Sequence, residues 1–247
     1  MQLVPKGYKQ KLSNAVAHYW LTLSTQAAKQ KSGDADRGRR AAVTGGKQMD
    51  GFCELIAWIC IKNGLSDADV HLTGKSKLTI PGFYRPTKQW DIVIVQNGYL
   101  VAAIEFKSQR GPSFGNNFNN RTEEALGTAE DFWTAYREGA FGMDRPRPWS
   151  GWLMLLEDCN KSYVEVKVLE KNFPVLPEFD ETSYAQRYEI LARKLMLEKK
   201  YDQAAFLMTS QNGGAKGKYT EPAKDLSMHP FLASLAGHIR VFLERIE

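Results

Sequence analysis

The stretch QWDIVIVQNGYLVAAIEFKS, residues 89–108, decides the fold. Two apolar runs flank Asn97-Gly98, and this pattern is a strong signal for a β-hairpin. With a two-residue loop, Asp91 lies opposite Ile104, so that Asp91 and Glu105 point to opposite faces of the hairpin. With a three-residue loop and a glycine bulge, Asp91 faces Glu105 directly. The sequence leaves both registers open, and the register decides whether the two acids can act together.

The second register gathers two carboxylates and a lysine on one face of the hairpin. The Cβ atoms of Asp91 and Glu105 would be about 5 Å apart, and Lys107 follows on the same face by strand alternation. Two like charges this close need a cation, and Mg²⁺ prefers a few carboxylates together with water and phosphate oxygens. Lys107 could then orient or help to deprotonate a metal-bound water. The hypothesis is a PD-(D/E)xK nuclease site, with Asp91, Glu105 and Lys107 as catalytic residues and Mg²⁺ on the two acids.

Other interpretations compete with this one. An ExK pair is common on half-exposed strands, where it forms only a solvated rim, and Gln89-Trp90 stands where the motif's name has a proline. Asp50 and Glu54 are candidates for a further acidic metal ligand, and Asp50 is preferred. The alternative is that Asp50 caps a helix and Glu54 faces solvent.

The segment GPSFGNNFNNR, residues 111–121, is rich in glycine and asparagine and predicts a loop after the strand. Asparagine can pair with the major-groove edge of adenine and arginine with that of guanine, so the loop could read bases near a scissile phosphate. The alternative is a set of turns in which Asn120 caps the next helix. The predicted DNA-binding residues are Asn116, Asn117, Asn119, Asn120, Arg121, Ser108, Lys88 and Arg85.

The order of predicted elements indicates an α/β fold with a mixed central sheet flanked by helices and with helical N- and C-terminal additions. The expected helices are 8–31, 50 to about 62, 120–139, 184–208 and 230–246, and the expected strands are 70–80, 90–96, 99–107 and 152–158. Residues 211–225 are expected to form a flexible basic loop. The whole chain, 1–247, is expected to be a single nuclease domain, comprising a basic helical arm and linker (1–48), a catalytic core (49–160) and a mostly helical extension (161–247) that clamps DNA or forms a dimer.

Composition bounds the function. The chain of 247 residues is 43% hydrophobic, enough for a proper core, and has no apolar run long enough for a membrane helix and no signal peptide, which predicts a cytoplasmic protein. Three cysteines without CxxC spacing and four scattered histidines argue against disulfide, thiolate-zinc and histidine-metal sites. Residues 1–48 carry nine Lys or Arg and two Asp, whereas the net charge of the whole chain is +5. A basic arm on a nearly neutral body suits a polyanionic partner.

Three longer blocks carry a resemblance: PGFYRPTKQWDIVIV, VAAIEFKSQRGPSFGNNFNNRTEEALGTAEDFWTAYREG and GWLMLLEDC. Together they closely resemble the XhoI-type family of type II restriction endonucleases, over most of residues 40–200. The resemblance implies an α/β, PD-(D/E)xK restriction-endonuclease-like core. The resemblance implies Mg²⁺-dependent cleavage of double-stranded DNA within the palindrome CTCGAG, leaving 5′ extensions with 5′-phosphates. The family's acidic pair and lysine fall on Asp91, Glu105 and Lys107. A palindromic target implies a homodimer, and a restriction enzyme implies a cognate DNA methyltransferase in the same cell.

Two other functions stay open. The first is a nuclease of the same core with another target or a repair role. The second is a DNA-binding module that has lost activity, although intact Asp91, Glu105 and Lys107 argue against that reading.

Overall fold

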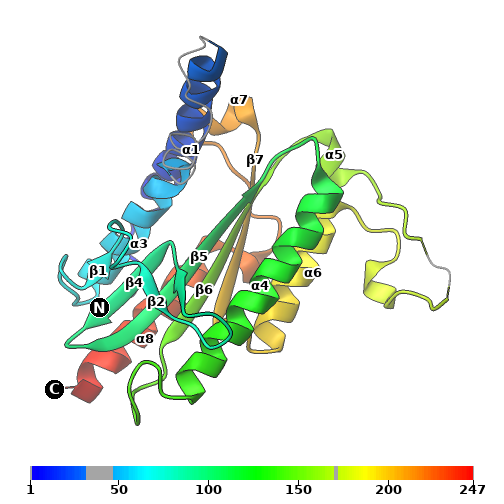
Figure 1. The fold of residues 1–247 in the computed structure, drawn as a ribbon. Helices are drawn as coiled ribbons and strands as arrows, with labels where there is room; N and C mark the ends of the chain where they lie inside the picture. Colours follow the sequence, from blue (N-terminus) through cyan, green and yellow to red (C-terminus); the bar gives the residue numbers. More distant parts are fainter. Residues whose placement is uncertain (1, 32–46, 170–171, 247) are drawn as a thin grey trace.

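The computed structural model describes residues 2–31, 47–169 and 172–246, so that residues 32–46 of the expected arm and linker (1–48) lie outside them. A mixed five-stranded sheet in the order β1-β4-β5-β6-β7 is covered by helices on both faces (Figure 1). The strands are β1 (Val70–His71), β4 (Ile92–Gln96), β5 (Tyr99–Gln109), β6 (Trp149–Glu157) and β7 (Gln203–Thr209). Strand β4 is antiparallel to both β1 and β5, and β5, β6 and β7 run parallel. A mixed α/β fold was predicted, and the structure confirms it.

Two apolar layers hold helices on the sheet. One face carries α1 (Tyr8–Lys31), α3 (Asp50–Lys62) and α8 (Met228–Ile246), and the other carries α4 (Phe114–Arg137) and α6 (Tyr184–Leu197). We call these the α3/α8 face and the α4/α6 face. Strand β6 is buried along its whole length apart from its last residue, as expected for an apolar strand covered on both sides. None of the helices in the described part of the chain combines the length and apolar character that crossing a membrane requires.

Shorter elements complete the chain. A separate hairpin pairs β2 (Thr79–Pro81) with β3 (Thr87–Gln89). The remaining helical turns are η1 (Lys47–Met49), α5 (Asn160–Tyr163), η2 (Pro177–Phe179), α7 (Gln211–Gly214) and η3 (Lys224–Leu226). The hairpin β2–β3 precedes β4 directly and brings the segment 82–89 over the middle of the sheet.

The hairpin β4–β5 combines the two registers that the sequence left open. Asn97 and Gly98 both have positive φ and form a two-residue turn, so Gln96 pairs with Tyr99. A bulge follows, because Val95 pairs with Leu100 but Ile94 pairs with Ala102. The extra residue, Val101, packs on the α3/α8 face beside Ala102, and its carbonyl oxygen accepts a hydrogen bond from His238 Nε2 of α8 at 3.1 Å. Beyond the bulge the register is the one that sets Asp91 against Glu105.

Two predictions of secondary structure are wrong. Helix α4 begins at Phe114 with Ser113 as its N-cap, so residues 114–121 are helical and Asn120 caps nothing. Phe114 and Phe118 pack on Tyr184 of α6, and this packing outweighs the modest helix propensity of asparagine. Residues 203–209 form strand β7 instead of continuing a helix, because a short apolar run fits either element and the sheet offers it two buried faces.

Other boundaries also differ from expectation. Asp50 is the first residue of α3 and does not cap it, because η1 runs directly into the helix and Met49 takes the cap position. The expected strand 70–80 is replaced by the short β1 and β2, and the expected loop 211–225 holds the turns α7 and η3. The end of α3 at Asn63-Gly64 is confirmed, with Gly64 at a φ of +113°.

Candidate active site

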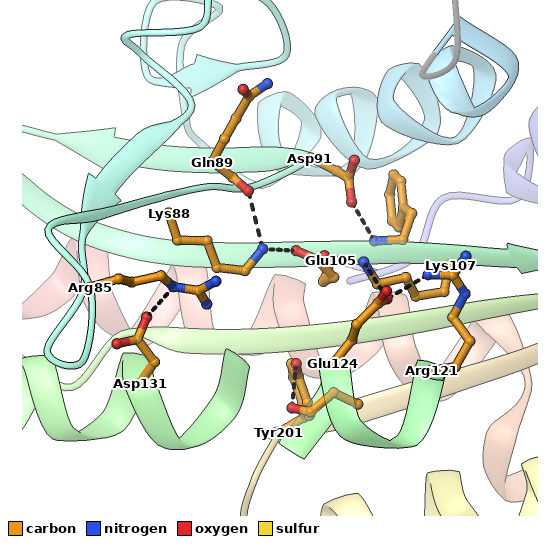
Figure 2. A network of polar contacts seen from close by, with 12 residues as sticks. Arg85, Lys88, Gln89, Asp91, Glu105, Lys107, Arg121, Glu124, Asp131 and Tyr201 are labelled. Carbon is orange, nitrogen blue, oxygen red and sulfur yellow. Dashed lines mark hydrogen bonds and ion pairs between the residues drawn. The ribbon is translucent and has the colours of Figure 1, made fainter. Parts of the chain in front are cut away.

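Glu105 lies at the centre of a charged cluster on the α4/α6 face of β5 (Figure 2). It is 5% exposed, and each carboxylate oxygen accepts from a different lysine. Lys88 Nζ of β3 is 2.7 Å from Oε2, and Lys107 Nζ is 2.5 Å from Oε1. Lys88 also lies 4.8 Å from the centre of the Trp90 ring, which holds its stem against apolar surface. A buried carboxylate is thus balanced by two ammonium groups that come from different strands.

Asp91 lies at the edge of the sheet where β4 and β5 separate. Strand β4 begins at Ile92, opposite Ile104, so the part of β5 beyond Ile104 has β6 as its only strand partner among the described residues. Asp91 Oδ2 accepts a 2.7 Å hydrogen bond from the backbone N–H of Phe106. Burial and the charge of Glu105 raise the pKa of Asp91 to about 6, against the opposing effects of the Phe106 N–H, Lys107 and Lys88. The two acids are therefore close enough to repel each other.

Lys107 stands between two carboxylates. Besides Glu105, its Nζ lies 3.4 Å from Glu124 Oε2 of α4. Burial by itself lowers the pKa of Lys107, but the charges of Glu105, Glu124 and Asp91 outweigh it, so the pKa lies above its usual value. The lysine is therefore held as a cation.

Glu124 is a residue of the cluster that sequence reasoning missed. Its Oε2 also pairs with Arg121 Nη1, three residues earlier on α4. Burial raises the pKa of Glu124, yet Lys107 and Arg121 together hold it below its usual value. The i,i+3 pair with Arg121 was visible in the sequence, but it carries meaning only once residue 121 is known to be helical. The Nε of Arg121 is buried with no hydrogen-bond partner in the part of the chain that the structure describes.

The four asparagines occupy the first two turns of α4, on its half-buried to exposed side. Because residues three and four apart share a helix face, Asn116, Asn119 and Asn120 lie together, and Asn117 lies near Arg121. Their side-chain amides make no hydrogen bond within the described residues. The polar side of α4 therefore runs from these amides to Glu124 and the catalytic strand.

The remaining predicted residues are dispersed. Ser108 alternates to the other face of β5, where its hydroxyl bonds the buried Tyr19 of α1. Arg85 Nε is 2.8 Å from Asp131 Oδ2 of α4. Asp50 is exposed on α3, where its charge interacts with His18 and Lys47. The structure thus places Arg85 beside the cluster and leaves Ser108 and Asp50 outside it.

The carboxylates of the cluster provide part of the ligand set that a hard divalent cation needs. Asp91 and Glu105 supply carboxylate oxygens from adjacent strands, and burial together with the charge of Glu105 raises the pKa of Asp91. In the described ranges no three His, Cys, Asp or Glu side chains come together to form a metal site. Two protein carboxylates fit Mg²⁺, which usually keeps several waters and takes oxygens from substrate phosphate.

Comparison with known proteins identifies the class and then the family. The chain is 51% identical over 216 residues to the Type II restriction enzyme BstVI of Geobacillus stearothermophilus, which covers 85% of this chain and 95% of that relative. It is 51% identical over 183 residues to the Type II restriction enzyme XhoI of Xanthomonas vasicola, or 74% of this chain and 73% of that one. The Type II restriction enzyme AbrI of Azospirillum brasilense is 53% identical over 163 residues, 66% of this chain and 72% of that relative. The enzyme class is therefore that of the type II site-specific deoxyribonucleases.

Residues 28–221 match the family described as Restriction endonuclease XhoI, and the chain belongs to this family. Restriction enzymes act on double-stranded DNA, and type II enzymes generally use divalent metal ions. No solved structure matches the chain.

Proposed function

We propose that this enzyme is a PD-(D/E)xK nuclease that cuts both strands of DNA within the palindrome CTCGAG, in a Mg²⁺-dependent reaction that leaves 5′ extensions with 5′-phosphates. The observation that carries the proposal is the buried cluster of Glu105 and Lys107 with Asp91 beside it, at the edge where β5 loses its β4 neighbour. A phosphate could approach β5 there without meeting another strand. The target sequence rests on family membership and on the name of the relative XhoI.

Each residue of the cluster has a distinct task. Asp91 and Glu105 would hold Mg²⁺, which when bound supplies Lewis acidity and neutralises charge that develops on phosphorus. Lys107, kept cationic by Glu105 and Glu124, orients the attacking water and stabilises the negative charge of the transition state. Lys88 holds Glu105 in place before DNA arrives and then faces the DNA backbone.

DNA recognition is assigned to the polar side of α4. Asn116, Asn117, Asn119, Asn120 and Arg121 would contact base edges, since amide and guanidinium groups pair with adenine and guanine in the major groove. Their placement on one helix supports this proposal better than a loop would, because a helix fits the major groove as a rigid unit. Arg85, Lys88 and the basic N-terminal segment would contact phosphates, which adds affinity without specificity.

The assembly follows from the target. A palindrome has twofold symmetry, so we expect a homodimer with one active site for each strand. We also expect a cognate methyltransferase that protects the host's own sites, and a cytoplasmic location.

The test is digestion of a sequenced plasmid with a single CTCGAG site, with Mg²⁺ and with EDTA, followed by sequencing of the ends. One metal-dependent cut inside CTCGAG supports the proposal. Lys107→Ala should abolish cutting and keep DNA binding, whereas Lys75→Ala, which changes an exposed lysine, should leave both intact.

The other outcomes separate the alternatives. Discrete cuts elsewhere keep the nuclease and reject the target, and DNA binding without any cut supports an inactive binding module. Full cutting by Lys107→Ala would show that Lys107 is not catalytic.

A further inference from the structure

The loop between β2 and β3 presents two aromatic rings to solvent. Phe83 is 49% exposed and Tyr84 is 69% exposed, and their rings pack edge to face with centroids 4.9 Å apart. Aromatic residues are enriched at surfaces that contact a partner. This pair is close to the candidate active site in sequence, four residues before Lys88.

The loop is fixed by a single buried carboxylate. Asp131 Oδ1 accepts from the backbone N–H groups of Phe83 and Tyr84, each at 2.8 Å, and Oδ2 accepts from Arg85 Nε. Asp131 is 4% exposed. A Cβ atom on Gly82 would lie 2.7 Å from the Asp131 carboxylate, so the close approach needs a glycine there. The backbone that carries the two rings is therefore fixed by contacts that involve neither ring.

A groove of about 490 Å³ runs from this loop along α4 toward the catalytic cluster. Its walls include Tyr84, Arg85, Glu124 and Asp131, and Glu124 is the residue that pairs with Lys107. Figure 2 shows Arg85 and Asp131 on one side of Lys88 and Glu105, with Lys107, Glu124 and Arg121 on the other. The groove therefore ends at a residue, Glu124, that is in direct contact with Lys107.

The charge of the groove does not exclude a polyanion. Three of its four carboxylates are neutralised by cations: Asp131 by Arg85, Glu124 by Lys107 and Arg121, and Glu130 by Lys200 and Arg137. The remaining one is Glu123. Most of the negative charge of the walls is thus compensated, and Tyr84 supplies the aromatic part of the lining.

The spacing matches DNA. Asp131 is seven residues from Glu124, which is about 10 Å along the helix. Successive nucleotides of one strand are about 3.4 Å apart, so the aromatic pair would meet DNA about three base pairs from the scissile phosphate. That distance lies within a six-base-pair target or at its edge.

We propose that Phe83 and Tyr84 form an aromatic contact to the substrate DNA, packing against bases or deoxyriboses about three base pairs from the cut. This inference rests on the proposed function, because it takes double-stranded DNA as the occupant of the groove. Aromatic rings on a rigid loop suit this role, since they lose little conformational freedom when they pack against a base.

The test compares Tyr84→Ala and Phe83→Ala with Phe173→Ala, which removes a ring that is 85% exposed on the segment between α5 and α6. Binding to a CTCGAG duplex is measured in EDTA, so that no cleavage competes. Tyr84→Ala should weaken binding by about fivefold or more, as for loss of a base–aromatic contact, and Phe173→Ala should not. A 2-aminopurine placed in the target should change fluorescence on binding to the wild type and not on binding to Tyr84→Ala.

Other results would overturn the inference. If the affinities of Tyr84→Ala and Phe83→Ala lie within about twofold of that of Phe173→Ala, the two rings do not contact DNA. A weaker affinity that accompanies a lower oligomeric mass in sedimentation would assign the rings to an interface between copies of the chain. If the wild type binds DNA and cuts none, the proposed function fails and the binding comparison still decides the inference. If the wild type binds no DNA, both fail.

Discussion

Two buried acidic sites lie on opposite sides of Lys88, and they are built in opposite ways. Asp131, 4% exposed, accepts from two backbone N–H groups and from one arginine. Burial raises the pKa of Asp131, but these donors outweigh it and hold the pKa below its usual value. At the other site, Asp91 has one backbone donor and a second carboxylate nearby, and its pKa rises to about 6.

The difference separates an acid that stabilises the fold, Asp131, from acids that are placed for function, Asp91 and Glu105. Asp131 is satisfied by the loop it holds, and its charge is stabilised in the folded chain. Asp91 is held close to Glu105 although the chain alone does not stabilise both charges. Such crowding costs stability and is typical of sites that bind a cation or perform chemistry.

The largest expected effect tests the crowded site. Glu105→Gln removes the charge that Lys88 and Lys107 share and one of the two proposed metal ligands. We expect kcat to fall by about a thousandfold while the chain stays folded. Steady-state cleavage and circular dichroism measure the two quantities, with Glu138→Gln at the exposed end of α4 as the control. Retention of wild-type kcat would remove Glu105 from catalysis.

The next largest effect is expected at Asp131, and it is an effect on the stability of the fold. Asp131→Ala leaves Arg85 and two backbone N–H groups without their acceptor, and we expect the free energy of unfolding to fall by about 2 to 4 kcal/mol. Urea denaturation measures the change. Asp131→Asn keeps an acceptor oxygen and should lose less. Equal stability of all three proteins would mean that the loop does not depend on Asp131.

Asp91→Asn is expected to change stability in the opposite direction from Asp131→Ala. The pKa of Asp91 rises from 3.8 to about 6 on folding, so between these values the folded chain binds more protons than the unfolded chain. Stability contributed by this group is present at low pH and is lost as pH rises through about 6, a loss of about 3 kcal/mol or less. In EDTA, Asp91→Asn should therefore be more stable than the wild type at pH 7 and nearly equal to it at pH 4. A destabilised variant at pH 7 would contradict the crowded-site interpretation.

Part of the fold and site could be predicted from sequence. Asn97-Gly98 between apolar runs fixes the β4–β5 hairpin locally, and the longer matching blocks carry the family. Residues 203–209 could not be assigned, because their apolar run is compatible with a helix or a strand and only the neighbouring β6 decides. The helix at residues 114–121 could not be predicted, because glycine and asparagine favour turns in the sequence. The helix depends on packing against α6, which only the folded chain provides.

The candidate site was predictable where it depends on strand alternation and not where it depends on tertiary contact. Glu105 and Lys107 share a face because side chains alternate between the two faces of a strand. Glu124 joins them only because α4 crosses the sheet at that point, and Asp131 finds residues 83–85 only because the β2–β3 hairpin folds over α4. No local pattern encodes either contact.

Because Val101 is an extra residue in the hairpin, the number of residues between Asp91 and Glu105 decides whether the two carboxylates share a face. Adding or removing one residue anywhere between Asp91 and Glu105, with the turn unchanged, would exchange the two faces of one strand and turn one carboxylate away from the other. Substitutions in this hairpin can be tolerated while changes of length by an odd number cannot. Across related enzymes, the number of residues between these acids, thirteen here, should therefore stay odd even where their identities drift.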